Sequence, residues 1–151
     1  MNVRVVRGGT ETHSSGMDNN ADIVRRFTEE AWGKGDLAVV DELVAPDAVP
    51  PHATDVGGPE GYKQEIMHIR NGISDYRTVV EDVFGVGDRV AIRWSTTGRH
   101  TGMLFGLPPT GKEVYIPGVD IFRLVDGKIV EHWGEDAMPS LLSQIGAFPA
   151  G

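Results

Sequence analysis

The chain has 151 residues, of which 40% are apolar and 24% charged, values typical of one globular domain. It has no cysteine, which excludes disulfides, thiolate zinc sites and a cysteine nucleophile. Acidic residues outnumber basic ones by 22 to 14 and Arg25-Arg26 is the only basic cluster, so nucleic acids and anionic membranes are not expected partners. No apolar run approaches the roughly 20 residues of a membrane span. We expect a cytoplasmic domain that handles small molecules or other proteins.

The N-terminal segment carries no helical or strand period beyond residues 3–6 and lacks the apolar centre of a secretory signal. We expect residues 1–18 to form a disordered tail and residues 19–151 to form one domain.

The first half of this domain predicts three helices, because apolar residues recur there at helical spacing. The first begins after Asn19-Asn20, which can cap it, and ends at Gly33. The second is capped by Asp36 and stopped by Pro46. The third has Pro59 at its first position.

The pattern then changes to alternation, which indicates β-strands. Strands are expected over residues 76–84, 89–97, 112–125 and 128–134. A bulge or sharp bend is expected at Pro117-Gly118, and a short closing helix around Pro139. Helices followed by strands predict an α+β fold, with the helices on one face of a bent antiparallel sheet.

The last hairpin has two possible registers. A two-residue turn at Asp126-Gly127 would place Asp120 opposite Trp133, whereas a three-residue loop with a bulge would place Asp120 opposite His132. A slip of one residue exchanges the two faces of a strand. We favour the second register because it gathers an acid and an imidazole on an apolar face. That face would contain Asp120, Phe122, Leu124, Val130 and His132.

Four stretches together resemble SnoaL-like polyketide cyclases, within the nuclear-transport-factor-2-like superfamily. They are IVRRF with GKGD (23–36), GPEG (58–61), GRHTG to PPTG (98–111) and VDIFR to DGKIVEHW (119–133). The resemblance covers nearly the whole chain after Asp18. It implies a cone-shaped α+β barrel, in which three N-terminal helices pack on a strongly bent mixed or antiparallel sheet, with a short C-terminal helix. It also implies a cavity, no metal or organic cofactor, and frequent homodimers through the outer sheet face.

The family's catalytic pair does not transfer intact. The resemblance implies an acid/base aspartate at the position of Gly134 and a histidine at the position of Asp120. In this chain a carboxylate stands on the facing strand instead. His52 also lies one place later than the corresponding family histidine.

Asp120 and His132 are the candidate catalytic residues. A carboxylate between Val119 and Ile121 is desolvated unless it is paired, and such a group can exchange a proton near neutral pH. An imidazole opposite it would have its tautomer fixed by the carboxylate. The alternatives are an ion pair of Asp120 with Arg93 or with protonated His132, and a core histidine with no catalytic role.

Further residues are candidates for binding a substrate: His52, Trp32, Tyr62, Trp94 and Phe122. Aromatic residues at these spacings are also common in a plain core. Met67 is a weaker candidate, His68 is expected to be solvated and His100 to be structural. The apolar triplet 103–105 suits a lid or a dimer contact. No zinc-binding or nucleotide-binding pattern occurs.

These features favour a cofactor-independent enzyme that binds an apolar small molecule and uses acid/base catalysis. Cyclisation, dehydration or isomerisation of a natural-product intermediate is the expected chemistry. A non-catalytic binding or carrier protein of the same fold is the alternative, and a dimeric protein-interaction domain is a third interpretation.

Overall fold

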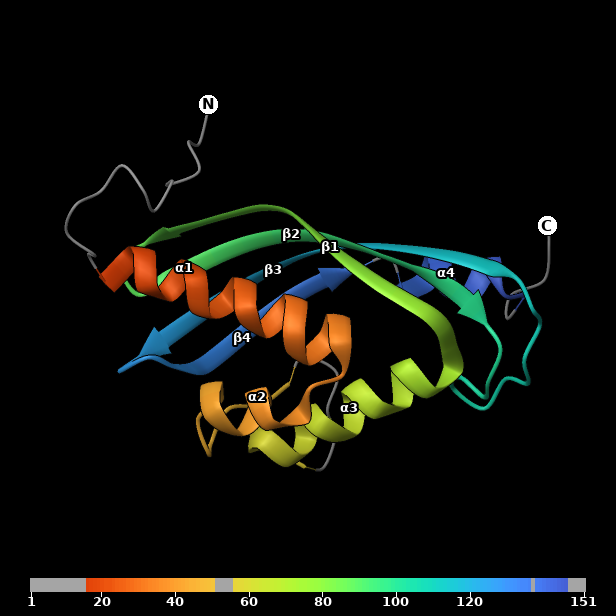
Figure 1. Ribbon diagram of the computed structural model, residues 1–151, viewed down its shortest axis with the longest axis horizontal. Coiled ribbons are helices and arrows are strands. Elements are labelled where there is room, and N and C mark those ends of the chain that lie inside the picture. Colours follow the sequence, from red (N-terminus) through yellow and green to blue (C-terminus); the bar gives the residue numbers. More distant parts are fainter. Residues whose placement is uncertain (1–15, 51–55, 137, 147–151) are drawn as a thin grey trace.

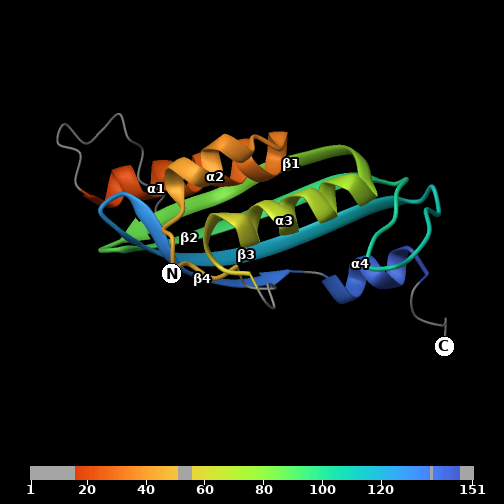
Figure 2. The ribbon, with the colours of Figure 1, turned by 90° about the horizontal axis from the view of Figure 1, so that it is seen from below.

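A four-stranded antiparallel sheet with helices on one face forms the protein, in a computed structural model that describes residues 16–50, 56–136 and 138–146. The strands follow one another across the sheet in the order β1-β2-β3-β4. They span Ile73–Val86, Arg89–His100, Glu113–Val125 and Lys128–Asp136. The sheet is long and curved, and helices α1, α2 and α3 lie over its concave side (Figures 1 and 2). The expected α+β fold is confirmed.

The first helix is longer than the sequence indicated. Helix α1, Gly16–Arg26, begins before the Asn19-Asn20 pair that was expected to cap it. It runs directly into a π-helical segment, η1, Phe27–Trp32. Wider turns of this kind are rare and occur frequently at functional sites.

Helices α2 and α3 occur where the sequence predicts them. In α2, Leu37–Leu43, the Asp36 carboxylate accepts a hydrogen bond from the Ala38 amide at 3.2 Å, which confirms the predicted cap. Helix α3, Gly58–Gly72, carries a proline in its first turn. It buries one face, which includes Tyr62, Ile66 and Ile69. A short helix α4, Met138–Gln144, closes the described part of the chain.

The predicted irregularity at Pro117-Gly118 is absent from the pairing with β2. The register of β2 and β3 runs without a shift from Arg89↔Arg123 to Arg99↔Glu113. Strand β4 pairs with β3 only as far as Gly118. Pro117 therefore lies beyond the end of that ladder, where a missing N–H costs little. The observed register shifts lie instead in β1 and in the last hairpin.

The last hairpin has neither of the two simple registers. Asp126 and Gly127 both have positive φ, 50° and 77°, and Val125 pairs with Lys128, so the turn has two residues rather than the favoured three. A bulge then shifts the pairing by one residue between Arg123 and Leu124. Asp120 consequently lies opposite Gly134, and the predicted Asp120–His132 pairing is wrong. The observed and predicted pairings differ by two residues, so the predicted sharing of one face is confirmed.

Two apolar clusters fill the space between the helices and the sheet. In the larger cluster, the ring of Phe27 meets those of Tyr62 and Phe122 edge-to-face, at centroid distances of 5.4 and 5.9 Å. Trp32 and Trp94 pack against both clusters. Within the described residues, no helix is long and apolar enough to cross a membrane.

Candidate active site

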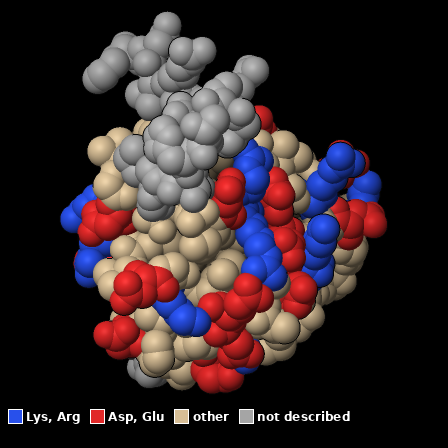
Figure 3. Space-filling view, turned by 60° about the vertical axis from the view of Figure 1, so that its left-hand side comes forward, with Lys and Arg blue, Asp and Glu red and all other residues tan. Residues whose placement is uncertain are grey.

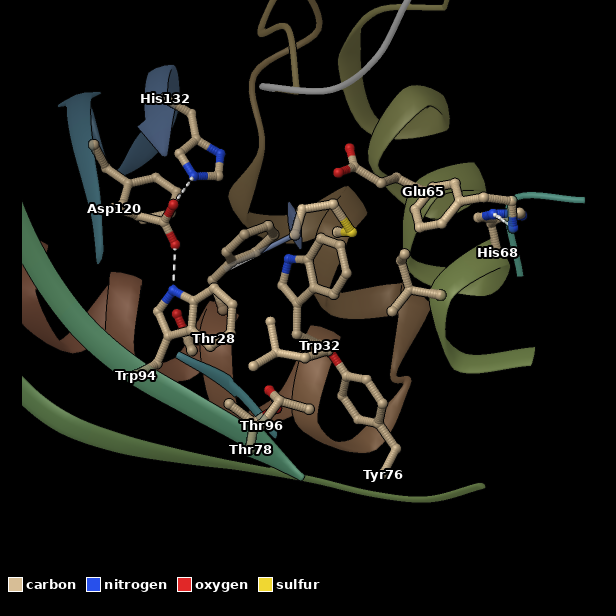
Figure 4. A pocket seen from close by; sticks show the side chains of 16 residues that line it. Thr28, Trp32, Glu65, His68, Tyr76, Thr78, Trp94, Thr96, Asp120 and His132 are labelled. Carbon is tan, nitrogen blue, oxygen red and sulfur yellow. Dashed lines mark hydrogen bonds and ion pairs between the residues drawn. The ribbon is translucent and has the colours of Figure 1, made fainter. Parts of the chain in front are cut away.

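A cavity of about 280 Å³ lies between η1, α3 and the concave face of the sheet. Its size is near the lower end of the range for small-molecule pockets. Most of its wall is aromatic or aliphatic, and the polar groups are few (Figure 4). The lining residues are Phe27, Thr28, Trp32, Glu65, His68, Ile69, Tyr76, Thr78, Trp94, Thr96, Phe105, Ile116, Asp120, Phe122, His132 and Met138.

Asp120 reaches this cavity from β3 and is held by a tryptophan of β2. The indole Nε1 of Trp94 donates a hydrogen bond to Asp120 Oδ2 at 2.6 Å (Figure 4). Trp94 lies directly opposite Gly118, and a Cβ on Gly118 would come within 2.3 Å of the indole. The absence of a side chain at residue 118 therefore leaves room for the ring that holds Asp120.

His132 contacts the other oxygen of the same carboxylate. Its Nε2 lies 3.1 Å from Asp120 Oδ1, within ion-pair distance but not aligned as a hydrogen bond. Its Nδ1 lies 2.9 Å from the Tyr62 hydroxyl oxygen. Only 6% of the His132 side chain is exposed, against 16% of Asp120. Both ring nitrogens thus face protein groups, while the carboxylate is the more accessible member of the pair.

The tautomer of His132 is set by its two partners, Asp120 and Tyr62. Burial raises the pKa of Tyr62 far above its usual value, and the nearby carboxylates of Glu65 and Asp120 raise it further. The hydroxyl therefore stays protonated. The Asp120 carboxylate can only accept, which favours the neutral imidazole with its proton on Nε2; Nδ1 then accepts a hydrogen bond from the Tyr62 hydroxyl. The carboxylate keeps lone pairs that this contact and Trp94 leave unused.

One of the structural alternatives for Asp120 does not occur. Arg93 makes its ion pair with Asp82, at 2.6 Å between Nη2 and Oδ2. Arg93 lies opposite Val119 in the β2–β3 ladder, so its side chain lies on the other face from that of Asp120. The remaining alternative is an ion pair between Asp120 and protonated His132, which would use the 3.1 Å contact between Asp120 Oδ1 and His132 Nε2.

A second group of polar atoms lies on the cavity floor (Figure 4). The hydroxyls of Thr78 and Thr96 are hydrogen-bonded at 2.8 Å across β1 and β2. The hydroxyl of Tyr76 interacts with both threonines, and burial raises its pKa. Neutral donors and acceptors in this position can bind a carbonyl or hydroxyl group of a ligand.

The predicted substrate-binding residues are only partly brought together. Trp32, Trp94 and Phe122 line the cavity. Tyr62 does not, because it is fully buried behind His132, where it acts on the imidazole instead. His52 lies outside the described residues. Met67 does not line the cavity, and it is 43% exposed.

The other predictions near the cavity have mixed outcomes. His68 is exposed as expected, but it also lines the cavity and its Nε2 accepts a hydrogen bond from the Phe105 amide at 3.3 Å. His100 is completely buried, and its Nδ1 contacts Thr110. The apolar triplet is divided, since Leu104 is buried while Phe105 is 46% exposed at the cavity.

Glu65 is a cavity residue that the sequence analysis missed. It stands three residues after Tyr62 and four before Ile69, so it shares the apolar face of α3. An acid within an apolar helical stripe was the available signal. In Figure 4 its carboxylate points from α3 into the cavity, across from His132.

The charges around the cavity are acidic. No Lys or Arg stands among the described residues that line it, whereas Asp120 and Glu65 do. On the face shown in Figure 3, acidic and basic side chains are interspersed. Among residues 16–50, 56–136 and 138–146, no group of three or more His, Asp or Glu side chains is placed to hold a metal ion.

Comparisons with known proteins identify the family and the fold. The family model for "SnoaL-like polyketide cyclase" matches residues 22–145. The nogalonic acid methyl ester cyclase of Streptomyces nogalater is 31% identical over 120 residues, covering 77% of this chain and 90% of that protein. A putative SnoaL-like polyketide cyclase from Jannaschia sp. CCS1 superposes with a TM-score of 0.80 at 28% identity, covering 92% of this chain and 99% of the other. A putative hydroxylase from Streptomyces galilaeus, AclR, has a TM-score of 0.76 at 29% identity, covering 89% and 85%.

Proposed function

Because the chain belongs to the SnoaL-like polyketide cyclase family, we propose that it closes a ring in a polyketide-type substrate by acid/base catalysis. The substrate is a largely apolar molecule with at least two carbonyl groups, bound in the cavity between the helices and the sheet. The observation that carries the proposal is the series of contacts Trp94–Asp120–His132–Tyr62 at one end of an apolar cavity.

Asp120 is the general base of this reaction. It removes a proton from a carbon next to a carbonyl group, and the resulting carbanion attacks a second carbonyl carbon of the same molecule. His132 is a positioning residue that stabilises the ionised carboxylate, since its own nitrogens face Asp120 and Tyr62. Proton transfers are the only chemistry that such a ring closure requires, so the side chains suffice without a cofactor.

The position of the acid supports this assignment despite the departure from the family. The resemblance implies an aspartate at Gly134, and Gly134 is the direct cross-strand partner of Asp120. Side chains at such paired positions start about 5 Å apart. The carboxylate therefore stands on the neighbouring strand, directly opposite the position that the resemblance implies, and it faces the cavity.

The test is conversion of nogalonic acid methyl ester, the compound that the Streptomyces nogalater relative is named for. We expect the wild-type protein to form a cyclised isomer and Asp120→Asn to lower the rate by about 10²–10⁴-fold. Asp82→Asn is the matched control, because Asp82 is paired with Arg93 away from the cavity. Wild-type turnover retained in Asp120→Asn contradicts the proposal.

The second candidate function is that of a non-catalytic binding protein. It is favoured by Gly134, because the acid that the resemblance implies is not at that position. Saturable binding of the same ester without any product supports this candidate.

We further propose a homodimer through the outer face of the sheet. Tyr115, Val119, Ile121 and Trp133 are between 42% and 53% exposed there, and the guanidinium of Arg89 lies 5.2 Å from the Trp133 ring. A group of large exposed apolar side chains is typical of an interface. Light scattering should give the mass of a dimer for the wild-type protein and of a monomer for Ile121→Arg. A monomeric wild-type protein contradicts this interface.

A further inference from the structure

The tip of the loop between β2 and β3 lies at the mouth of the cavity. Phe105 lines the cavity and is 46% exposed, so its ring stands between the cavity and solvent. His68 of α3 is also an exposed lining residue, and in Figure 4 it lies across the cavity from Asp120. The end of the cavity that Phe105 and His68 form is therefore remote from the proposed base.

The backbone of this tip is strained at Phe105. Leu104 and Leu107 exchange two backbone hydrogen bonds, of 2.8 and 3.1 Å, which close a two-residue turn. Both central residues, Phe105 and Gly106, have positive φ, 49° and 76°, as in a type I′ turn. The first central position of such a turn favours asparagine, aspartate or glycine, because a larger side chain is strained there. A bulky aromatic residue in this conformation beside a ligand cavity points to a function for its ring.

The last turn of α3 holds the loop in place. The amides of Thr101 and Gly102 both donate to the Gly72 carbonyl, at 3.1 and 3.2 Å. Leu104 is fully buried and packs so closely that a Cβ on Gly72 would come within 2.9 Å of its side chain. The loop is thus anchored on both sides of the helix end, and its tip is directed over the cavity.

His68 holds the tip itself. The Phe105 amide donates a hydrogen bond to His68 Nε2 at 3.3 Å, and the two ring centroids are 4.9 Å apart. Because His68 stands four residues before Gly72, it projects from the same side of α3 as the point that anchors the loop. The backbone and the ring of Phe105 are therefore both held by one side chain.

A ligand that fills this cavity meets the Phe105 ring. The volume of about 280 Å³ is near the lower end for small-molecule pockets, so a polycyclic ligand with one end at Asp120 extends to the mouth. Aromatic rings gain most from other flat rings, stacked or edge-on. A shorter ligand ends before the mouth and does not gain this contact.

We propose that Phe105 is a specificity residue, which packs against a flat ring at the end of the substrate remote from the reacting carbonyl groups, and that His68 is its positioning residue. The reaction at the other end of the cavity rests on the proposed function. The ring contact itself requires only that a ligand is bound.

The binding experiment uses two neutral ketones of different length, 1-hydroxyanthraquinone with three fused rings and 1-tetralone with two. Calorimetric titration gives the affinity of the full chain for each. We expect the wild-type protein to bind the longer probe more tightly. Phe105→Ala should weaken binding of that probe by about 10-fold and leave the affinity for 1-tetralone within about 2-fold. Phe105→Tyr keeps a ring and should keep the preference. Met103→Ala is the matched control, because Met103 is 58% exposed in the same loop and does not line the cavity.

The same probes test the positioning role of His68. His68→Ala removes the acceptor of the Phe105 amide and the ring beside it, and should reduce the preference for the longer probe by about 3–10-fold. His68→Gln offers a side-chain carbonyl as acceptor and should restore part of that preference. A wild-type preference in His68→Ala overturns the positioning role.

Two variants at residue 105 separate the function of the ring from the strain of the turn. Phe105→Ala and Phe105→Gly both remove the ring, but glycine adopts positive φ without strain. We expect equal losses of affinity, with a urea midpoint about 0.3–0.5 M higher for Phe105→Gly than for Phe105→Ala. Weak binding by the more stable variant cannot then be attributed to unfolding. Wild-type affinity in Phe105→Gly overturns the role of the ring.

The outcomes also distinguish this role from the proposed function. With nogalonic acid methyl ester, Phe105→Ala should raise KM by about 10-fold and leave kcat within about 2-fold, because a contact remote from the reacting groups stabilises ground and transition states alike. A lower kcat at unchanged KM overturns the specificity role, and so does a wild-type protein that binds 1-hydroxyanthraquinone no more tightly than 1-tetralone. A wild-type protein that binds the longer probe through Phe105 but does not convert the ester overturns the proposed function alone.

Discussion

Replacing Gly118 by alanine should displace Trp94 and weaken the protein. The new Cβ would lie 2.3 Å from Cζ2, 2.6 Å from Cε2 and 2.9 Å from Cη2 of the indole. Non-bonded carbon atoms normally come no closer than about 3.5 Å, so the indole ring must move by about 1.2 Å. A shift of that size breaks the 2.6 Å hydrogen bond from Trp94 to Asp120.

The expected destabilisation is about 1.5–5.5 kcal/mol. Overpacking of this kind costs about 1–3 kcal/mol, and loss of a hydrogen bond to a charged group costs about 1.5–3 kcal/mol. Alanine returns about 0.4–1 kcal/mol by restricting the unfolded chain, since the backbone of Gly118 is not in the left-handed region. With a urea slope of about 2 kcal/mol per molar, the unfolding midpoint should fall by about 1–3 M.

Two further variants show whether the clash is the cause. Gly33→Ala is the matched control, because its Cβ would meet nothing closer than 3.4 Å, and we expect no loss of stability. Trp94→Phe removes the outer ring atoms that the Cβ introduced by Gly118→Ala would strike. Combined with Gly118→Ala, it should reveal a coupling free energy of about 1–3 kcal/mol. A coupling below about 0.5 kcal/mol, or a Gly118→Ala protein as stable as wild type, refutes the reasoning.

Three other changes test the local structure, each by urea or thermal unfolding. Tyr62→Phe leaves His132 Nδ1 without its donor and should cost about 1–3 kcal/mol at neutral pH. Because the pKa of Tyr62 is raised on folding, the free energy of unfolding decreases as pH rises above about 10. Tyr62→Phe should make this decrease shallower by about 1.4 kcal/mol per pH unit. An unchanged slope at alkaline pH argues against a buried, protonated phenol. Asp36→Ala should cost about 1 kcal/mol through loss of the α2 cap, and no change in melting temperature would mean that this cap contributes nothing. Phe27→Ala removes the ring that touches Tyr62 and Phe122 and should cost about 3–5 kcal/mol, so a loss under about 1 kcal/mol would show that this cluster is not well packed.

The sequence was sufficient for the elements whose signals are local. Asp36 and Pro59 mark the starts of α2 and α3 because capping and proline chemistry act within one turn. The alternation that predicts strands also assigns Asp120 and His132 to one face, and this survives the wrong register because faces depend only on parity. The sequence could therefore predict that Asp120 and His132 lie on the same face, although their register was wrong.

The features of the site that the sequence did not predict depend on tertiary contacts. The bulge between Arg123 and Leu124 is not marked by any glycine or proline, so the diagonal placement of Asp120 and His132 had no local signal. The pattern marks Tyr62 as an aromatic core residue, and only the tertiary fold brings its hydroxyl, on α3, to the imidazole on β4. The π-helical turns of η1 likewise have no sequence signature here, although they present Thr28 and Trp32 to the cavity.

The most direct test of the order of contacts around Asp120 is the ¹⁵N spectrum of His132 in the ligand-free protein. In the neutral form of the ring we expect the proton to be on Nε2, facing Asp120, with Nδ1 accepting from Tyr62. The Nδ1 resonance should shift in Tyr62→Phe, and the Nε2 resonance in Asp120→Asn. A proton on Nδ1 instead would leave Nε2 as an acceptor beside a carboxylate, and would contradict the assignment of Asp120 as the base that His132 positions.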